Sequence, residues 1–311
     1  MSAEVDAWVL SRRPAREQRN AYLPYEYFVE GECAAGGAVE PVATIFLTNR
    51  ECPFRCVMCD LWRNTLTETV PVGAIPAQID HALLKLPPAK QLKLYNSGSF
   101  FDQRAIPPAD YSAIAMRANG FERLIVENHP ALVGDACLRF RDLLSGRLEV
   151  AMGLETAHAE VLGRLNKRMT LDQFSTAANF LRRNGIDLRV FILVRPPYMA
   201  ATEALKWAER SLEFAMEHGA TAAVLIPTRA GNGAMEELQA SEQFAPPALH
   251  ILESAMEYGL GLKAGRVFAD LWGLRESCVH CHAQRAGRLR QMNLQQRVVD
   301  RIPCSRCCGA S

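Results

Sequence analysis

The chain has 311 residues, a length that suits one large α/β domain or a domain with an appendage. With 49% hydrophobic and 22% charged residues it can bury a substantial core, which excludes wholesale disorder and collagen-like or mucin-like classes. Its 35 Lys and Arg against 34 Asp and Glu give a net charge of +1, so any nucleic-acid-binding surface must be local.

Residues 1–40 are polar and weakly periodic, and we expect them to form an arm packed on the main domain. From residue 41 onward, apolar runs alternate with amphipathic stretches, which is typical of parallel strands joined by helices. The runs that predict strands are 42–47, 92–95, 123–127, 148–154, 188–194 and 222–226. The stretches that predict helices are 75–86, 109–119, a helix opened by a capping box at Thr170 and ended by Gly185, and 202–218.

Six such units predict an α/β fold, a partial (β/α)6 TIM-like barrel that is open along one side. A flat doubly wound sheet is the competing architecture. We divide the chain into an N-terminal arm (1–40), a partial-barrel core (41–235), a helical and strand extension (236–277), and a small Cys-rich metal-binding tail (278–311).

The N-terminus lacks the pattern of a secretory signal, and no apolar run approaches the roughly 20 residues of a membrane-spanning helix. The ten cysteines are clustered, which favours metal sites over disulfides. We therefore expect a cytoplasmic protein with free thiols and no membrane partner.

A cysteine loop directly follows the first predicted strand, with Cys52, Cys56 and Cys59 in the spacing C-x3-C-x2-C. Three thiolates on one short loop can hold three corners of a 4Fe-4S cubane and leave the fourth iron open to a small molecule. S-adenosylmethionine (SAM) fits this chemistry, because its sulfonium bond can be cleaved reductively. A zinc site without a nearby fourth ligand and buried structural thiols are the alternatives.

This motif and its position resemble the radical SAM superfamily over residues 41–235. The resemblance implies that Cys52, Cys56 and Cys59 are the catalytic, cluster-binding residues. It also implies that SAM is cleaved to a 5′-deoxyadenosyl radical that abstracts hydrogen from a substrate, with an electron from a reductant such as flavodoxin or ferredoxin. Met58 stands where the family commonly has an aromatic residue, and it can still supply an apolar contact to adenine.

Further candidates for the cofactor site follow other predicted strands. Asn96, Ser97 and Gly98 come after the second strand, where radical SAM proteins carry a segment that meets the methionine end of SAM. Glu155 ends the fourth strand and could bind ribose hydroxyls or the SAM ammonium, while Arg195 suits a carboxylate. Ordinary turns and peripheral ion pairs are the alternatives. Residues 127–129, including His129, are expected on the pocket wall facing the substrate.

Segments 96–102, 126–130, 153–156, 166–170 and 195–197 together resemble the branch that contains the archaeosine-forming radical SAM lyase. The catalytic subunit of the elongator complex is a more distant resemblance. Members of that branch act on tRNA, so the resemblance implies a modified nucleoside in tRNA as the substrate.

The tail carries two C-x2-C pairs, Cys278 with Cys281 and Cys304 with Cys307, which predict a metal site. Zinc is the first choice and an auxiliary iron-sulfur cluster the second. Arginines between and beside the pairs predict a local phosphate-binding surface or, alternatively, a solvated helical face: Arg285, Arg288, Arg290, Arg297, Arg301 and Arg306. The competing functions are a zinc-dependent RNA-binding protein on a catalytically silent barrel and a protein whose cluster only relays electrons.

Overall fold

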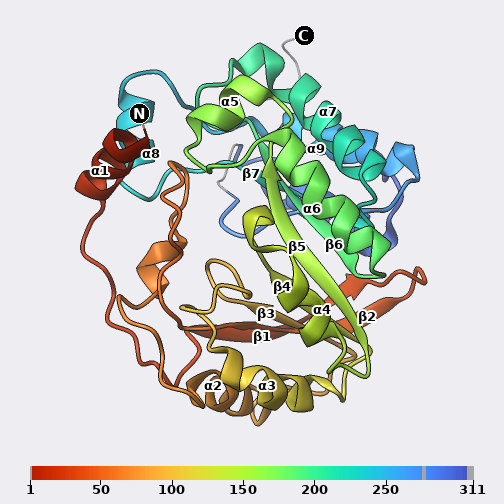
Figure 1. Cartoon of the computed structure of the whole chain (residues 1–311). Helices are drawn as coiled ribbons and strands as arrows, with labels where there is room; N and C mark the ends of the chain where they lie inside the picture. The colour runs from red at the N-terminus through yellow and green to blue at the C-terminus, as the bar shows by residue number, and fades with distance from the viewer. Residues whose placement is uncertain (1, 275–277, 307–311) are drawn as a thin grey trace.

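The computed structural model describes residues 2–274 and 278–306, and its centre is one eight-stranded sheet in the order β1 to β8 (Figure 1). Strands β2 to β8 pair in parallel, and β1 pairs antiparallel with β2. The strands are β1 (Glu26–Cys33), β2 (Val39–Phe46), β3 (Gln91–Tyr95), β4 (Arg123–Glu127), β5 (Arg147–Glu155), β6 (Asp187–Val194), β7 (Ala222–Pro227) and β8 (Arg266–Ala269).

The sheet curls into a half-barrel, and helices cover its outer face (Figure 1). The helices are α1 (Ser2–Arg12), α2 (Ala74–Leu83), α3 (Tyr111–Ala118), α4 (Asp135–Arg141), α5 (Ala159–Arg164), α6 (Leu171–Arg183), α7 (Ala204–Glu217), α8 (Ala234–Ala240), α9 (Leu249–Leu262) and α10 (His282–Gln295). Within the described ranges, none of them combines the length and apolar character that crossing a membrane requires.

The predicted partial barrel is confirmed, since the six predicted strands correspond to β2 through β7. The capping box at Thr170 is also present and opens α6, where the Thr170 and Gln173 side chains each accept the other's backbone N–H. Two edge strands, β1 and β8, extend the sheet beyond the six units.

Side chains alternate between the two faces of each strand, as the pleat requires. Outward residues such as Ile45, Leu94 and Val126 are fully buried in the main core, which the covering helices share. The inward residues differ along the strands. Charged side chains gather near the amino ends of the parallel strands, aromatic side chains lie further along, and the cysteine loop and its neighbours lie at the carboxyl ends.

The charged group forms what we call the ionic floor, defined by Glu32, Lys93, Glu149, Arg189 and Arg266. Glu149 is fully buried and accepts hydrogen bonds from Arg189 Nε at 2.6 Å and from Arg266 Nη2 at 3.3 Å. Glu32 accepts from Arg189 Nη2 and from Lys93 Nζ, each at 2.6 Å. Each buried charge therefore has partners of opposite sign, which offsets the cost of removing it from water.

Helix α10 covers the free edge of β8 with side-chain amides. Asn293 bonds both the N–H and the C=O of Ala269, at 2.8 and 2.9 Å. Gln296, just after the helix, bonds both backbone groups of Val267, each at 2.8 Å. These two amides take the place of a ninth strand.

Candidate active site

The cysteine loop lies at the carboxyl ends of the parallel strands, where α/β folds build their sites. Contacts from distant parts of the chain fix its backbone. The N–H of Val57 donates to the carbonyl of Leu165 at 3.0 Å. Asn232 Nδ2 donates to the carbonyls of Val57 and Cys59, at 2.7 and 3.0 Å. The three cysteines are therefore presented by a loop of defined conformation.

The N-terminal arm contacts this loop. Glu51, which directly precedes Cys52, binds Arg13 at 2.6 Å, Arg55 at 3.0 Å, and Arg16. On α1, Asp6 accepts a hydrogen bond from Asn166 Nδ2 at 2.8 Å. The same amide nitrogen donates to the carbonyl of Arg55 at 2.8 Å, so α1 and the loop share a partner.

The three loop thiols lie in surroundings that disfavour a free thiolate, because burial raises the pKa of Cys52, Cys56 and Cys59 to about 12. A metal that takes the proton's place removes this penalty. Three thiolates presented by one loop can each bind a different iron of one cluster.

The segment after β3 borders the loop. Asn96 is fully buried, and neither its side-chain oxygen nor its nitrogen has a partner among the described residues. A Cβ at Gly98 would lie 3.2 Å from the Cβ of Cys52, so the absence of a side chain permits this close approach. An unpaired buried amide beside a thiol loop indicates a site built for a polar ligand.

Glu127, at the end of β4, holds this segment in place. Its Oε1 accepts hydrogen bonds from the backbone N–H groups of Asn96 and Gly98, the latter at 3.2 Å. Burial raises the pKa of Glu127 to about 7, against the opposing effect of these hydrogen bonds. Ser97 lies between them with φ of +53°, and its Oγ is 3.0 Å from the Tyr25 hydroxyl.

Glu155, at the end of β5, pairs with Lys167, whose Nζ lies 2.6 Å from Glu155 Oε1. Both side chains are 9% exposed. Burial alone lowers the pKa of Lys167, but Glu155 and Cys56 outweigh it and raise that pKa. A Cβ at Gly153 would overlap Glu155 Oε1 and lie 2.6 Å from Lys167 Nζ, so this glycine makes room for the pair.

Sequence reasoning missed Lys167 as a site residue. The segment 166–170 contributed only to the family resemblance, and no periodicity joins Lys167 to Glu155, 12 positions earlier. The signal that could have identified Lys167 is its position within segment 166–170, which the resemblance had already singled out.

His129, expected on the pocket wall facing the substrate, makes contacts that support the loop. Its Nδ1 accepts from the N–H of Ala131 at 3.1 Å, so Nε2 carries the proton and donates to the Lys167 carbonyl at 3.0 Å. Its ring stacks on Phe54 of the cysteine loop, with centroids 3.8 Å apart. Burial, together with Lys167, lowers the pKa of His129 to about 3, which keeps the ring neutral.

Arg195 and Met58 also lie at this end of the barrel. Arg195 Nη1 donates to the carbonyl of Pro246 at 3.2 Å, and its buried Nε lacks a partner within the described part of the chain. Met58 packs against two small apolar clusters, with Val57 in one and Leu165 in the other.

Backbone strain is concentrated here. Ser97, Glu155 and Arg195 all have positive φ, at +53°, +66° and +54°, and each stands where a different strand ends. Such conformations cost of order 1 kcal/mol or more per residue and are common at functional sites.

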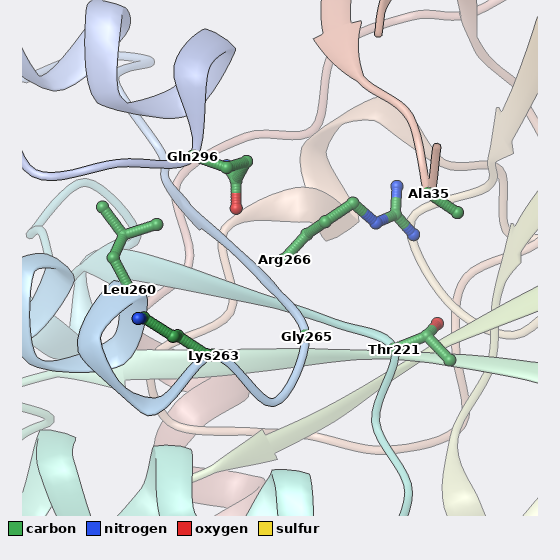
Figure 2. A pocket seen from close by; sticks show the side chains of 7 residues that line it. All are labelled: Ala35, Thr221, Leu260, Lys263, Gly265, Arg266 and Gln296. Carbon is green, nitrogen blue, oxygen red and sulfur yellow. The ribbon is translucent and has the colours of Figure 1, made fainter. Parts of the chain in front are cut away.

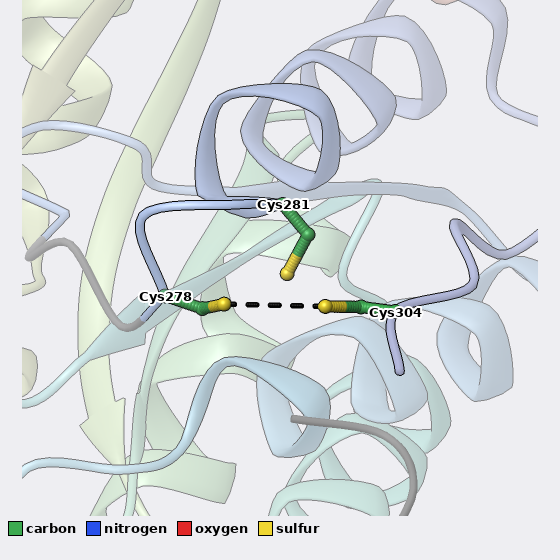
Figure 3. A group of neighbouring side chains, drawn as sticks. All are labelled: Cys278, Cys281 and Cys304. Carbon is green, nitrogen blue, oxygen red and sulfur yellow. Dashed lines mark hydrogen bonds between the residues drawn. The ribbon is translucent and has the colours of Figure 1, made fainter. Parts of the chain in front are cut away.

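In the tail, the structure brings three of the four predicted ligands together (Figure 3). The sulfurs of Cys278, Cys281 and Cys304 all lie within 4.8 Å of one another, and those of Cys278 and Cys304 are 4.0 Å apart. The fourth predicted ligand, Cys307, lies outside the described residues.

The predicted phosphate-binding surface is wrong for two of its arginines, Arg285 and Arg288, and a third, Arg301, also has an acidic partner. Arg285 Nε and Arg288 Nη1 bind Glu253, at 3.1 and 3.3 Å, and both arginines are buried. Arg301 Nη2 binds Glu257 at 2.7 Å. These side chains attach α10 and the tail to α9. The count of charges in the tail did not include their acidic partners, because those partners lie on α9.

A pocket of about 360 Å³ lies away from the cysteine loop, near the amino ends of β7 and β8 (Figure 2). Thr221 and Arg266 are among its lining residues, and it contains none of the predicted site residues.

No family model matches the chain. Archaeosine synthase subunit beta of Methanosarcina acetivorans is 26% identical over 79% of this chain and 75% of that protein. The protein of the same name in Thermococcus kodakarensis is 24% identical over 51% of each chain. An N-terminally truncated Elp3 of Methanocaldococcus infernus has a similar fold, with TM-score 0.52 and 13% identity over 86% of this chain. The match covers 65% of the Elp3 chain, somewhat less than two thirds. The chain is thus similar in sequence to archaeosine synthase subunit beta and in fold to Elp3, the two proteins that the sequence resemblance pointed to.

Proposed function

We propose that this chain, a relative of archaeosine synthase subunit beta with the radical SAM fold, is a radical SAM enzyme that acts on a modified nucleoside in tRNA. The observation that carries the proposal is the loop of three free, half-buried cysteines at the carboxyl ends of the strands, beside the unpaired amide of Asn96. The tRNA substrate rests on the names of the relatives.

In this proposal Cys52, Cys56 and Cys59 would hold a 4Fe-4S cluster to which SAM could bind. The cluster and SAM would supply the radical chemistry that abstracts hydrogen from the substrate. A reductant such as flavodoxin or ferredoxin delivers the electron.

The residues around the loop bind and orient SAM. Asn96 and Ser97 offer hydrogen-bonding groups, and Gly98 allows the backbone to approach closely. Arg195, with an unpaired Nε, suits a carboxylate, and Met58 offers an apolar contact to adenine.

The pair of Glu155 and Lys167 adds both signs of charge to this end of the barrel. Glu155 suits the ribose hydroxyls or the SAM ammonium, and Lys167 stabilises the thiolates of Cys52 and Cys56.

The experiment is anaerobic reconstitution with iron and sulfide, followed by SAM and dithionite. We expect about four irons and four sulfides per chain at the loop and release of 5′-deoxyadenosine. Cys56→Ala should abolish both, while Cys137→Ala, a buried cysteine on α4, should leave both unchanged. A folded wild-type protein that binds neither iron nor SAM would falsify the proposal.

We further propose that the tail binds zinc through Cys278, Cys281 and Cys304, with Cys307 as the fourth ligand. The close spacing of the three sulfurs supports a single tetrahedral ion over an auxiliary cluster. Metal analysis of the Cys52→Ala, Cys56→Ala, Cys59→Ala triple variant isolates this site. We expect about one zinc per chain, and iron there would favour the cluster.

The alternative function is a zinc-dependent RNA-binding protein on a catalytically silent barrel, which the same close spacing in the tail supports. It predicts zinc without iron in the reconstituted wild type, together with tRNA binding that does not depend on SAM.

A further inference from the structure

We propose that an aromatic trio, Phe28, Phe46 and Trp272, stacks against the planar ring of the substrate base. This inference rests on the proposed function and deepens it, because it assigns a place and a recognition chemistry to the substrate.

The trio forms where the two ends of the sheet approach each other. Phe28 lies on β1, the first strand, and Trp272 follows β8, the last, yet their rings stack with centroids 5.8 Å apart and an interplanar angle of 21°. Phe46, at the end of β2, lies 6.0 Å from Phe28 and 6.4 Å from Trp272. Strands β1 and β8 are the two edges of the sheet and form no ladder with each other, so these rings bridge the two edges.

The exposure of the trio argues for more than packing. Trp272 is 57% exposed, which is unusual for so large an apolar side chain, and Phe28 and Phe46 are only partly buried. Further inside, Tyr95 and Phe191 continue the aromatic surface and are also only partly buried. Rings that only closed a seam would be covered, so this surface is suited to a flat ligand.

Two chains of contacts join the trio to the candidate active site. Arg229 Nη1 donates to the carbonyl of Trp272 at 2.9 Å, and Arg229 Nε lies 3.8 Å from Asp60, the residue after Cys59. On the other side, Tyr25 contacts Phe46 with centroids 5.5 Å apart and reaches Ser97 through its hydroxyl. A base held by the trio would therefore lie close to both the cysteine loop and the segment 96–98, which is proposed to bind SAM.

Carboxylates beside Trp272 indicate which class of ligand the trio would bind. Asp270 Oδ1 accepts the backbone N–H of Trp272 at 2.9 Å, and Asp270 Oδ2 lies 3.9 Å from Arg229. Burial raises the pKa of Asp270, and the carboxylates of Glu30 and Asp60 are near enough to add to that rise. Oxygen acceptors next to an aromatic face suit a heteroaromatic ring that carries amino groups, which is the chemistry of a nucleobase.

The test uses the reconstituted enzyme and tRNA from cells in which the gene is deleted. Three variants are compared with wild type: Trp272→Leu, which removes the ring, Trp272→Phe, which keeps one, and the control Phe214→Leu. Phe214 lies on α7 and contacts Phe174 of α6 and His218, away from the trio. Two rates are measured for each variant, SAM cleavage without tRNA and tRNA-dependent formation of 5′-deoxyadenosine.

We expect Trp272→Leu to raise the KM for tRNA about tenfold, because base–aromatic stacking contributes on that order. Trp272→Phe should recover most of the loss, the control should match wild type, and SAM cleavage without tRNA should be equal in all four proteins. An unchanged KM in Trp272→Leu overturns the inference. So does an equal loss of tRNA-independent cleavage, which would mean that Trp272 only holds the barrel together.

The two proposals fail in different ways. If loaded wild-type enzyme cleaves no SAM, the proposed function fails whatever the trio does. A second arm uses the same tRNA digested to nucleosides. We expect it to show no dependence on Trp272 at matched concentration, and a dependence equal to that of intact tRNA would overturn the assignment to a base in tRNA.

Discussion

Gly153 is needed at its position because of space. Its φ is not positive, and a methyl group there would enter the volume shared by Glu155 and Lys167. Gly153 therefore leaves room for the Glu155–Lys167 pair. The opposite charges of the pair offset the cost of burying each of them.

Substituting Gly153→Ala should therefore displace Lys167 without removing it. We expect the affinity for SAM to fall roughly 10-fold or more, because a charge-assisted hydrogen bond is broken and a buried charge loses its partner. Equilibrium dialysis with reconstituted protein measures the affinity. Gly163→Ala is the matched control, since a methyl there meets nothing within 4 Å. Equal affinities in the two variants would show that the pair plays no part in binding.

Glu127 predicts a dependence of stability on pH. Because burial raises its folded pKa to about 7, above the ordinary 4.5, the folded state binds the proton more tightly than the unfolded state does. The contribution of Glu127 to stability is thus present below pH 4.5 and is lost as the pH rises through 7.

In Glu127→Gln the amide oxygen can still accept both backbone N–H groups. We expect this variant to gain stability relative to wild type between pH 5 and 8, by less than roughly 3 kcal/mol. Urea unfolding of the metal-free proteins at both pH values measures the difference. A constant difference across that range would contradict the assignment.

Among the elements, β2 to β7 could be predicted because their outward residues form unbroken apolar patterns. Strands β1 and β8 could not. β8 has only four residues, of which Arg266 is charged, and β1 carries Glu30 and Glu32. Charged residues in a strand argue against burial until their partners are known, and Glu32 meets Arg189 across 157 positions of sequence.

The same limit applies to the site. The cysteine loop and the residues at the strand ends could be predicted because each stands next to a recognisable strand. Asp6 and Asn232 could not, since they reach the site only after α1 and the segment before α8 have folded over the loop.

Helix α10 predicts a local effect on the sheet edge. Asn293→Ala would leave the N–H and C=O of Ala269 without their amide partner, which costs about 1–3 kcal/mol for buried groups. We expect the amide of Ala269 to exchange hydrogen faster, as seen by mass spectrometry. Gln295→Ala, on the exposed side of α10, is the control and should exchange as wild type does. Equal protection in both variants would mean that the amide does not hold the edge.

At the scale of the whole molecule, the interior of the half-barrel changes in character from one end to the other. The ionic floor lies near the amino end, aromatic rings follow, and the cysteine loop with its polar neighbours lies at the carboxyl end. Phe268 marks the transition, because the guanidinium groups of Arg189 and Arg266 lie over its ring at 5.4 and 5.9 Å. The charges of the ionic floor are paired with one another. The strained residues and the unpaired polar groups lie at the opposite end, where the proposed ligands bind.

The ionic floor predicts how the fold responds to acid. Burial alone would raise the pKa of Glu149, but Arg189, Arg266 and Arg123 outweigh it and hold that pKa below its ordinary 4.5. Arg189 and Lys93 lower the pKa of Glu32 in the same way. Their contribution to stability is therefore fully present above pH 4.5 and is lost as the pH falls through the folded values.

Glu149→Gln tests this directly. Removing one buried charge leaves guanidinium groups without their partner, so we expect a loss of roughly 3–5 kcal/mol at pH 7. The variant should then lose less additional stability than wild type between pH 5 and 3, because one titrating group is gone. Urea unfolding across that range measures both effects. Glu122→Gln is the control, since its side chain is 66% exposed and lies 3.7 Å from Lys90, and it should change stability by less than about 1 kcal/mol. If the free energy of unfolding of Glu149→Gln fell with pH as steeply as that of wild type, the ionic floor would not be what stabilises the amino end of the barrel.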